Sequence, residues 1–211
     1  MKFWFKFAIY LLIALEVPPA AAGSYDDLFV AIIRDDVGSL AKLLARGVDP
    51  NSRDPNGQPA LIVAIRRESP RAFDLLLAQP TLDPDAANPA NETALMLTAI
   101  AGDADASRKL LARGAKAQRP GWSPIHYAAS GPGTDVAKLL LDSGASVDAE
   151  SPNGTTPLML AARHAPEGTV ELLLQRGADP RRRNQRGLQA IDFAEAGGRE
   201  YLVGRFQKLP R

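Results

Sequence analysis

An apolar residue followed nineteen positions later by a glycine or proline recurs about every 33 residues along this chain. Each apolar residue opens a short, alanine-rich segment, and successive openers are 33, 34, 30, 33 and 33 residues apart. The pairs are Leu28 and Gly47, Leu61 and Pro80, Leu95 and Gly114, Ile125 and Gly144, Leu158 and Gly177, and Ile191 and Pro210. This period predicts stacked units, each too small to bury its apolar face alone. We therefore expect function on a long surface made by all the units.

Residues 1–22 have the pattern of a secretory signal peptide. They begin with two lysines, continue with an apolar run over 7–15, and end in small residues that fit cleavage after Ala22. An uncleaved membrane anchor is the alternative, but Glu16 ends the apolar run well short of the roughly 20 residues that a bilayer requires. We expect an exported, periplasmic protein.

The composition excludes several kinds of chemistry. The chain has no cysteine, so it forms no disulfide and has no thiolate. Residues 1–22 contain two lysines and one glutamate, which leaves 23 basic and 23 acidic side chains in the mature chain. This balance does not suggest nucleic-acid binding. The C-terminal part, from Arg181 to Arg211, is nevertheless basic.

The fourth copy of the repeat shows how one unit is built. Thr156 is placed to cap a helix through its hydroxyl, and Pro157 follows at the first helical position, where a missing N–H costs nothing. Ala161 and Ala162 keep this helix thin, so that its neighbours can approach closely. A second helix with a leucine-rich stripe ends at Gly177, which we expect in the left-handed conformation.

This pattern resembles the ankyrin repeat, most clearly in the third copy, Gly121-Trp122-Ser123-Pro124-Ile125-His126-Tyr127-Ala128-Ala129. The resemblance implies an all-α solenoid of stacked helix-turn-helix units, each followed by a finger loop or hairpin. It also implies protein binding without catalysis or a cofactor. Recognition residues in this family usually come from the finger tips and the concave face of the first helices.

On this basis we divide the chain into a signal peptide and one ankyrin-repeat domain, 23–211. The units are an N-terminal cap repeat at about 25–53, repeats at about 54–87, 88–118, 119–150 and 151–183, and a C-terminal cap repeat at about 184–211. Degenerate end units are expected in a solenoid, because their outer faces meet water.

Departures from the pattern predict local differences. Asn91 replaces a turn glycine, and asparagine tolerates the left-handed region. The first copy has its proline at Pro59, one place early, and no hydroxyl cap, so its helix start should be weaker. The 30-residue step predicts a shortened finger around 118–120. In the last unit, charged side chains replace expected apolar or small residues at Glu195, Arg199 and Arg205.

Neither histidine indicates catalysis or a metal site. His126 stands where the family uses histidine to bond the backbone of a neighbouring loop. His164 has no patterned carboxylate partner, and Ser123 is better explained as a helix cap than as a nucleophile. We predict no catalytic residues, no metal and no cofactor.

Trp122 is the leading candidate for partner contact, because an exposed finger tryptophan is unusual unless it packs locally or meets a partner. Packing against Pro89 or Pro120 is the local alternative. We expect one concave strip made by Trp122, Tyr127, Arg66, Ile100, Ser130 and Arg163. Arg182, Arg183 and Arg186 of the last finger are further candidates, and the alternative there is a solvated charge run.

The sequence as a whole favours a monomeric, non-catalytic protein-interaction module of the cell envelope that binds another protein. Two alternatives stay open. One is an immunity or inhibitor protein that neutralises an envelope-acting toxin or hydrolase. The other is a membrane-surface adaptor that uses the basic run Arg181–Arg186.

Overall fold

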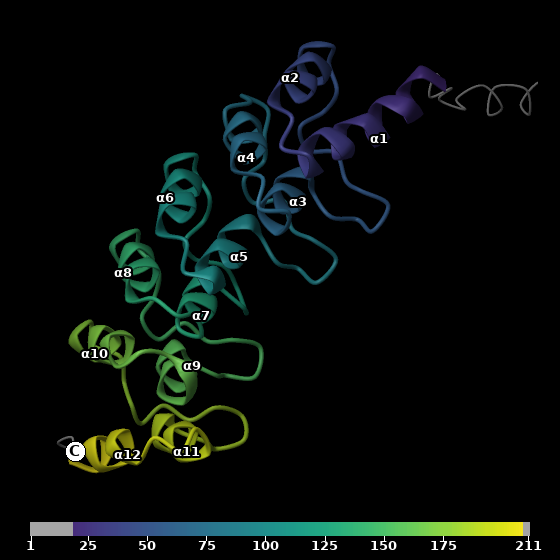
Figure 1. Cartoon of the computed structure of the whole chain (residues 1–211). Coiled ribbons are helices and arrows are strands. Elements are labelled where there is room, and N and C mark those ends of the chain that lie inside the picture. The colour runs from purple at the N-terminus through teal and green to yellow at the C-terminus, as the bar shows by residue number, and fades with distance from the viewer. Residues whose placement is uncertain (1–18, 209–211) are drawn as a thin grey trace, which may run out of the picture.

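The computed structural model describes residues 19–208, which form six pairs of antiparallel helices stacked in a curved row (Figure 1). The helices are α1 (Pro19–Ile33), α2 (Val37–Ala45), α3 (Ala60–Arg66), α4 (Pro70–Leu77), α5 (Ala94–Ala101), α6 (Ala104–Ala112), α7 (Pro124–Ala128), α8 (Thr134–Asp142), α9 (Pro157–His164), α10 (Glu167–Gln175), α11 (Ala190–Ala196) and α12 (Glu200–Lys208). Within these residues extended structure is limited to an isolated bridge between Arg53 and Pro59. The expected all-α solenoid is confirmed.

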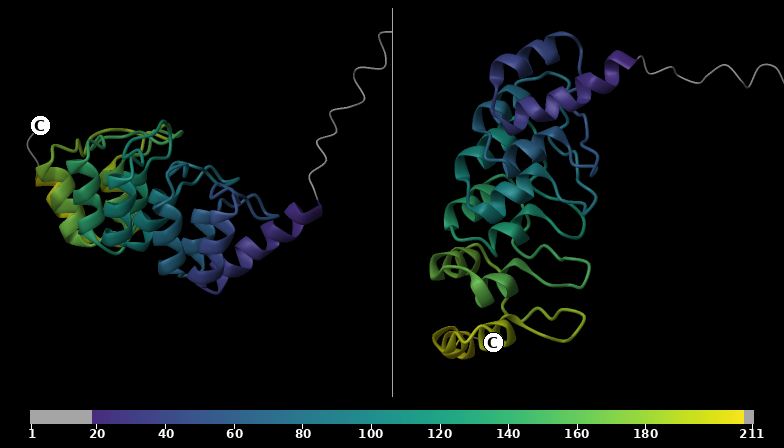
Figure 2. Two further views of the ribbon diagram at one scale, coloured as in Figure 1. Left: turned by 90° about the horizontal axis from the view of Figure 1, so that it is seen from above. Right: turned by 45° about the vertical axis from the view of Figure 1, so that its right-hand side comes forward.

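The loops between helix pairs project to one side as fingers (Figure 2). They comprise residues 46–59, 78–93, 113–123, 143–156 and 176–189. The third finger is the shortest, as the 30-residue step predicts. The helices before four of these fingers are followed by left-handed glycines, Gly47, Gly114, Gly144 and Gly177, with φ between 88° and 95°.

The repeat register places its apolar openers in the core. Leu28, Leu61, Leu95, Ile125 and Leu158 are all buried, with at most 3% of each residue exposed. The corresponding residue of the last unit, Ile191, is partly buried, as expected for a unit whose outer face has no neighbour.

Helix starts follow the sequence chemistry. The hydroxyls of Thr93 and Thr156 accept hydrogen bonds from the backbone N–H of Met96 and Met159, each at 3.4 Å. We call the first helix of each pair its inner helix. The inner helix α3 begins after Pro59 without a side-chain cap, as predicted. Asn91 adopts the expected left-handed backbone with φ of 61°.

The N-terminal helix starts earlier than the expected cap repeat. α1 begins at Pro19, and its alanine-rich first turn spans the predicted cleavage site after Ala22. Proline at a first helical position followed by alanines favours helix, which explains the extension. Residues 1–18 of the predicted signal peptide lie outside the described residues.

Side chains link each finger to the next. In each link a side-chain oxygen of one finger accepts a hydrogen bond from a backbone N–H of the following finger. The links are Asn51 to Asp83 at 2.8 Å, Asp85 to Lys116 at 3.0 Å, Gln118 to Ser146 at 3.0 Å and Asp148 to Asp179 at 3.2 Å. These bonds tie the fingers into one continuous surface beside the inner helices.

The apolar core is divided into two clusters. The first extends from α1 to α8, and the second begins at Ala129 and extends through α12. Leu141 packs against both clusters. None of the helices described over residues 19–208 is long and apolar enough to span a membrane.

Candidate functional site

Trp122 lies at the end of the shortest finger, directly before α7. Its residue surface is 42% exposed, and its indole meets the imidazole of His126 edge-on, with ring centroids 5.3 Å apart. The indole therefore has a local ring contact with His126. One edge of a large aromatic side chain is fixed while the rest faces solvent.

His126 is a buried structural residue, as predicted. Its Nε2 lies 3.0 Å from the carbonyl oxygen of Ala149 and 3.2 Å from that of Thr155, both in the next finger. Its Nδ1 accepts a hydrogen bond from the backbone N–H of Ser123 at 3.1 Å. This set fits a neutral ring with its proton on Nε2. Burial lowers the pKa of His126, which also favours the neutral form.

A hollow of about 350 Å³ opens beside Trp122 on the inner-helix face. Its lining joins side chains from three successive repeats: Glu92, Ile100, Trp122, His126, Tyr127, Ser130 and Leu160. Four of the predicted strip residues, Ile100, Trp122, Tyr127 and Ser130, thus come together in one place. Ile100 is 38% exposed, so this hollow presents apolar surface to a partner.

Glu92 anchors the N-terminal side of this hollow. Its carboxylate accepts hydrogen bonds from the Tyr127 hydroxyl at 3.4 Å and from Asn88 Nδ2 at 2.9 Å, and it pairs with Arg66 at 3.2 Å. Burial, followed by the charge of Glu92, raises the pKa of Tyr127. Arg66 therefore joins the strip through Glu92. The sequence did not identify Glu92 as part of this site.

A second hollow of about 380 Å³ continues from the first toward the C-terminus, and both are lined by Trp122 and Leu160. Its other lining residues include Arg163, Arg186, Leu188 and Phe193. Within the described part of the chain, neither the Arg163 nor the Arg186 guanidinium has a hydrogen-bond or ion-pair partner. The lining also includes the carboxylate of Asp192, so Trp122 stands between a largely apolar hollow and one whose two arginines outnumber its one carboxylate.

The predicted basic run of the last finger separates into different roles. Arg182 pairs with Asp148 at 3.6 Å and also with Glu150, so it ties this finger to the preceding one. Arg183 donates a hydrogen bond to the carbonyl oxygen of Gly187 in its own finger at 2.6 Å. The structure places Arg186, but not Arg182 or Arg183, in the lining of a hollow.

The described residues contain no group of three or more acidic or histidine side chains that could hold a metal ion. Ser123, the residue before α7, uses its hydroxyl within the finger, where it accepts from the Arg119 N–H at 3.3 Å and donates to the Ala117 carbonyl at 3.4 Å. His164 is exposed at the end of α9.

A family model for ankyrin repeats in three copies matches residues 28–120 and 115–184. The chain belongs to the ankyrin-repeat family. Ankyrin repeats bind other proteins, and the described geometry agrees with that general role, since neighbouring repeats together form the two hollows.

Curated relatives include neurogenic locus notch homolog protein 1 of Mus musculus, 31% identical over 166 residues that cover 71% of this chain and 7% of the relative. Neurogenic locus notch homolog protein 4 of Homo sapiens is 45% identical over 92 residues, which cover 42% of this chain and 5% of that protein. The chain therefore spans less than a tenth of the length of these relatives.

Two solved structures share the fold. An ankyrin repeat domain from Acinetobacter baumannii superposes with a TM-score of 0.73 at 23% identity, covering 84% of this chain and 94% of the other. A chain from the complex of a predatory endopeptidase of Bdellovibrio bacteriovorus with an immunity protein gives a TM-score of 0.70 at 23% identity, covering 82% and 93%.

Proposed function

We propose that this ankyrin-repeat protein is a non-catalytic binding module that holds one partner protein on a concave strip centred on Trp122. The observation that carries this proposal is the position of the indole, which is half-exposed, fixed on His126 and shared by two adjoining hollows. Tryptophan is enriched among the few residues that dominate binding energy at interfaces, particularly where a pocket surrounds it. Its attachment to His126 also reduces the entropy lost on binding.

The charges along the strip favour a defined orientation of the partner. At the N-terminal side Arg66 is already neutralised by Glu92, whereas Arg163 and Arg186 at the C-terminal side have no partner in the described structure. A partner should therefore present apolar side chains toward Ile100 and a carboxylate toward the two arginines. Such complementarity acts mainly on association rate and specificity.

The absence of cysteine allows a direct test. A cysteine introduced by Ser130→Cys gives a unique attachment site for a photo-crosslinker in the first hollow, and Ser39→Cys gives an exposed control on α2. The protein crosslinked through position 130 but not through position 39 is then titrated by calorimetry. We expect Trp122→Ala to weaken its binding at least tenfold, because a truncated aromatic anchor typically costs about 2 kcal/mol or more.

A matched control is Tyr201→Ala, since Tyr201 is another exposed aromatic, on α12 outside both hollows. It should leave the affinity unchanged. Equal affinity of Trp122→Ala and the unchanged protein would refute the strip as the binding site. Arg186→Ala should slow association and reduce its salt dependence more than Arg182→Ala, because Arg182 is already paired with Asp148 and Glu150.

We also propose that the mature protein is exported to a periplasm, with cleavage after Ala22. The support is the order of residues 1–22, from lysines through an apolar run to small residues. Cleavage would shorten α1 by its first turn, while Leu28 and the rest of the core remain. Sequencing of the mature N-terminus should find Gly23 first, and retention of Met1 on membrane-bound protein would contradict the proposal.

The second candidate function is an immunity or inhibitor role toward an envelope hydrolase. It is supported by the fold shared with a chain of the endopeptidase–immunity protein complex. An inhibitor predicts a single cognate hydrolase that co-purifies in a fixed ratio and loses activity on stoichiometric addition of this chain. A partner whose activity is unaffected by saturating amounts would leave binding alone as the function.

A membrane-surface role for Arg181–Arg186 has weaker support. Arg182 and Arg183 make hydrogen bonds within the protein, so two guanidinium groups of the run are already engaged. Binding to vesicles of anionic lipid, with a steep loss at raised salt, is the result that would favour it. We expect no such binding.

A further inference from the structure

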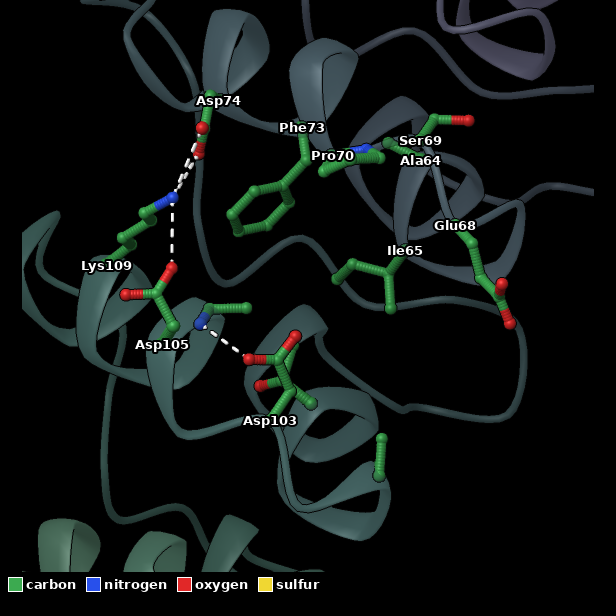
Figure 3. A pocket seen from close by; sticks show the side chains of 13 residues that line it. Ala64, Ile65, Glu68, Ser69, Pro70, Phe73, Asp74, Asp103, Asp105 and Lys109 are labelled. Carbon is green, nitrogen blue, oxygen red and sulfur yellow. Dashed lines mark hydrogen bonds and ion pairs between the residues drawn. The ribbon is translucent and has the colours of Figure 1, made fainter.

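A separate cleft lies at the end of the helix pairs that faces away from the fingers. It encloses about 400 Å³ between the pair α3 and α4 and the pair α5 and α6 (Figure 3). Each inner helix starts at its finger, so the end of α3 at Arg66 and the start of α4 at Pro70 mark the opposite end of the stack. None of the residues lining this cleft lines either hollow beside Trp122.

A small side chain, Ala106, lies in the lining of this cleft. Ala106 in α6 occupies the position held by Ala72, Val136 and Thr169 in α4, α8 and α10, four residues before the buried leucine of each helix. The other three residues are fully buried, whereas Ala106 is only partly buried. An alanine in this place fills less of the space between neighbouring pairs than the valine of α8.

The interior of the cleft suits an apolar side chain. Phe73 and Ile65 point into it, as Figure 3 shows, and Phe73 is covered by the protein except for 5% of its surface. The polar groups at its base are already satisfied. Ser107 donates its hydroxyl hydrogen bond to Thr98 at 2.9 Å, and Thr98 donates to the Leu95 carbonyl at 3.2 Å.

The rim of the cleft is acidic. On one side Asp74 and Asp105 both hold Lys109, at 2.9 and 3.1 Å, and on the opposite side stands Glu68 (Figure 3). In the described structure the Glu68 carboxylate has no hydrogen-bond or ion-pair partner, and the Asp103 carboxylate accepts only from the backbone N–H of Ala106 at 2.9 Å. The one lysine in the lining thus leaves a negative surplus around an apolar centre.

We propose that this cleft is a second protein-binding site, which takes a partner segment carrying an apolar side chain flanked by lysine or arginine. The apolar side chain enters between Phe73 and Ile65, and the basic groups lie over Glu68 and the Asp103 carboxylate. The site is independent of the strip beside Trp122, so the two surfaces can be occupied at once. Burial of the apolar side chain supplies the affinity, and the charges select the sequence.

A library of random linear peptides displayed on phage tests this proposal without a known partner. The library is selected on the unchanged protein after depletion on the double variant Glu68→Gln, Ala106→Val, which narrows the cleft and removes one rim charge. Enriched peptides should combine an apolar residue with lysine or arginine. Binding of a labelled peptide of this kind should weaken at least tenfold in the double variant and fall as salt rises.

Three controls make the outcome decisive. Ala106→Val should melt no lower than the unchanged protein, because α8 already has valine at this position. Glu167→Gln, at an exposed glutamate on α10, and Trp122→Ala should both leave peptide binding unchanged. Peptides without basic residues, equal binding to the double variant, or loss of binding in Trp122→Ala would each overturn the second site. The last result would leave the proposed strip standing.

Discussion

The indole of Trp122 stands edge-on against the imidazole of His126, with an angle of 77° between the ring planes. One ring belongs to an exposed side chain of the candidate strip, and the other bonds the backbone of the next finger at Ala149 and Thr155. The position of the exposed aromatic is thus set by a residue that also holds two repeats together. The contact between these two rings therefore links the proposed binding strip to the packing of neighbouring repeats.

The stability of the protein should fall on acidification because of His126. Burial lowers its folded-state pKa below the ordinary value of about 6.5, so the unfolded chain binds more protons as the pH falls through that value. The stability contributed by the neutral ring is therefore complete above pH about 6.5 and is lost progressively below it. Protonation of Nδ1 would also break its hydrogen bond from Ser123.

Urea unfolding at a series of pH values measures this effect. His126→Asn should be less stable at neutral pH and should show a flatter dependence between pH about 7.5 and about 5.5. The exposed His164 provides the control, since His164→Asn should retain the full dependence. An unchanged pH slope in His126→Asn would show that other groups control acid stability.

Ala161→Arg should destabilise the stack by more than about 3 kcal/mol, beyond the usual range for single substitutions. Ala161 is completely buried, and its carbonyl oxygen accepts a hydrogen bond from Arg199 at 2.8 Å. A charged side chain there would have to separate neighbouring inner helices. Thermal melting checks this, with Ala112→Arg on exposed helix surface as the control, which should change stability by less than about 0.5 kcal/mol.

Arg113 should contribute to stability by closing a helix end in the preceding repeat. Its guanidinium donates to the carbonyl oxygens of Leu77, Gln79 and Pro80 at 3.0, 2.7 and 2.9 Å. We expect Arg113→Ala to cost about 1–3 kcal/mol, and Arg113→Lys to recover only part, because lysine lacks the planar fork. Arg108→Ala, which removes an exposed arginine of the same helix, should have little effect in the same denaturation assay.

The last link between fingers should control the local opening of its finger. The Asp148 carboxylate accepts from the Asp179 N–H at 3.2 Å and pairs with Arg182 at 3.6 Å. Asp148→Ala should speed hydrogen exchange at the Asp179 amide without a comparable change at core amides. Asp148→Asn keeps an acceptor oxygen and should retain most of the protection. If the Asp179 amide exchanged at the same rate in Asp148→Ala as in Asp148→Asn, the link would be contradicted.

The sequence predicted the structural features that depend on residues at the same positions in every repeat. The period located the buried openers such as Leu158, the threonine cap at Thr156 and the left-handed Gly177, because each depends on neighbours within one unit. It also identified the strip residues around Trp122, although their role in binding stays a prediction. The position of the shortened finger likewise followed from spacing alone.

Contacts between units could not be predicted in the same way. Glu92 joins Arg66, 26 residues earlier, to Tyr127, 35 residues later, and neither the glutamate nor the tyrosine recurs at its position in another repeat. Arg182, a candidate for partner contact, pairs with two carboxylates of the preceding finger, which its own sequence neighbourhood does not indicate. The cleft beside Ala106 is lined by two neighbouring helix pairs, so it becomes visible only when these pairs are packed together.

The division of the core into two clusters gives the strip a mechanical meaning. Apart from Ala129, which belongs to the second cluster, the boundary lies between the pair α7 and α8 and the pair α9 and α10. The hollow beside Trp122 is lined by Ile100 of α5 and by Leu160 of α9, one on each side of this boundary. A protein bound in this hollow would contact both halves of the solenoid at once. We expect such a protein to restrict changes in the angle between the two halves, so that its binding makes the whole solenoid stiffer.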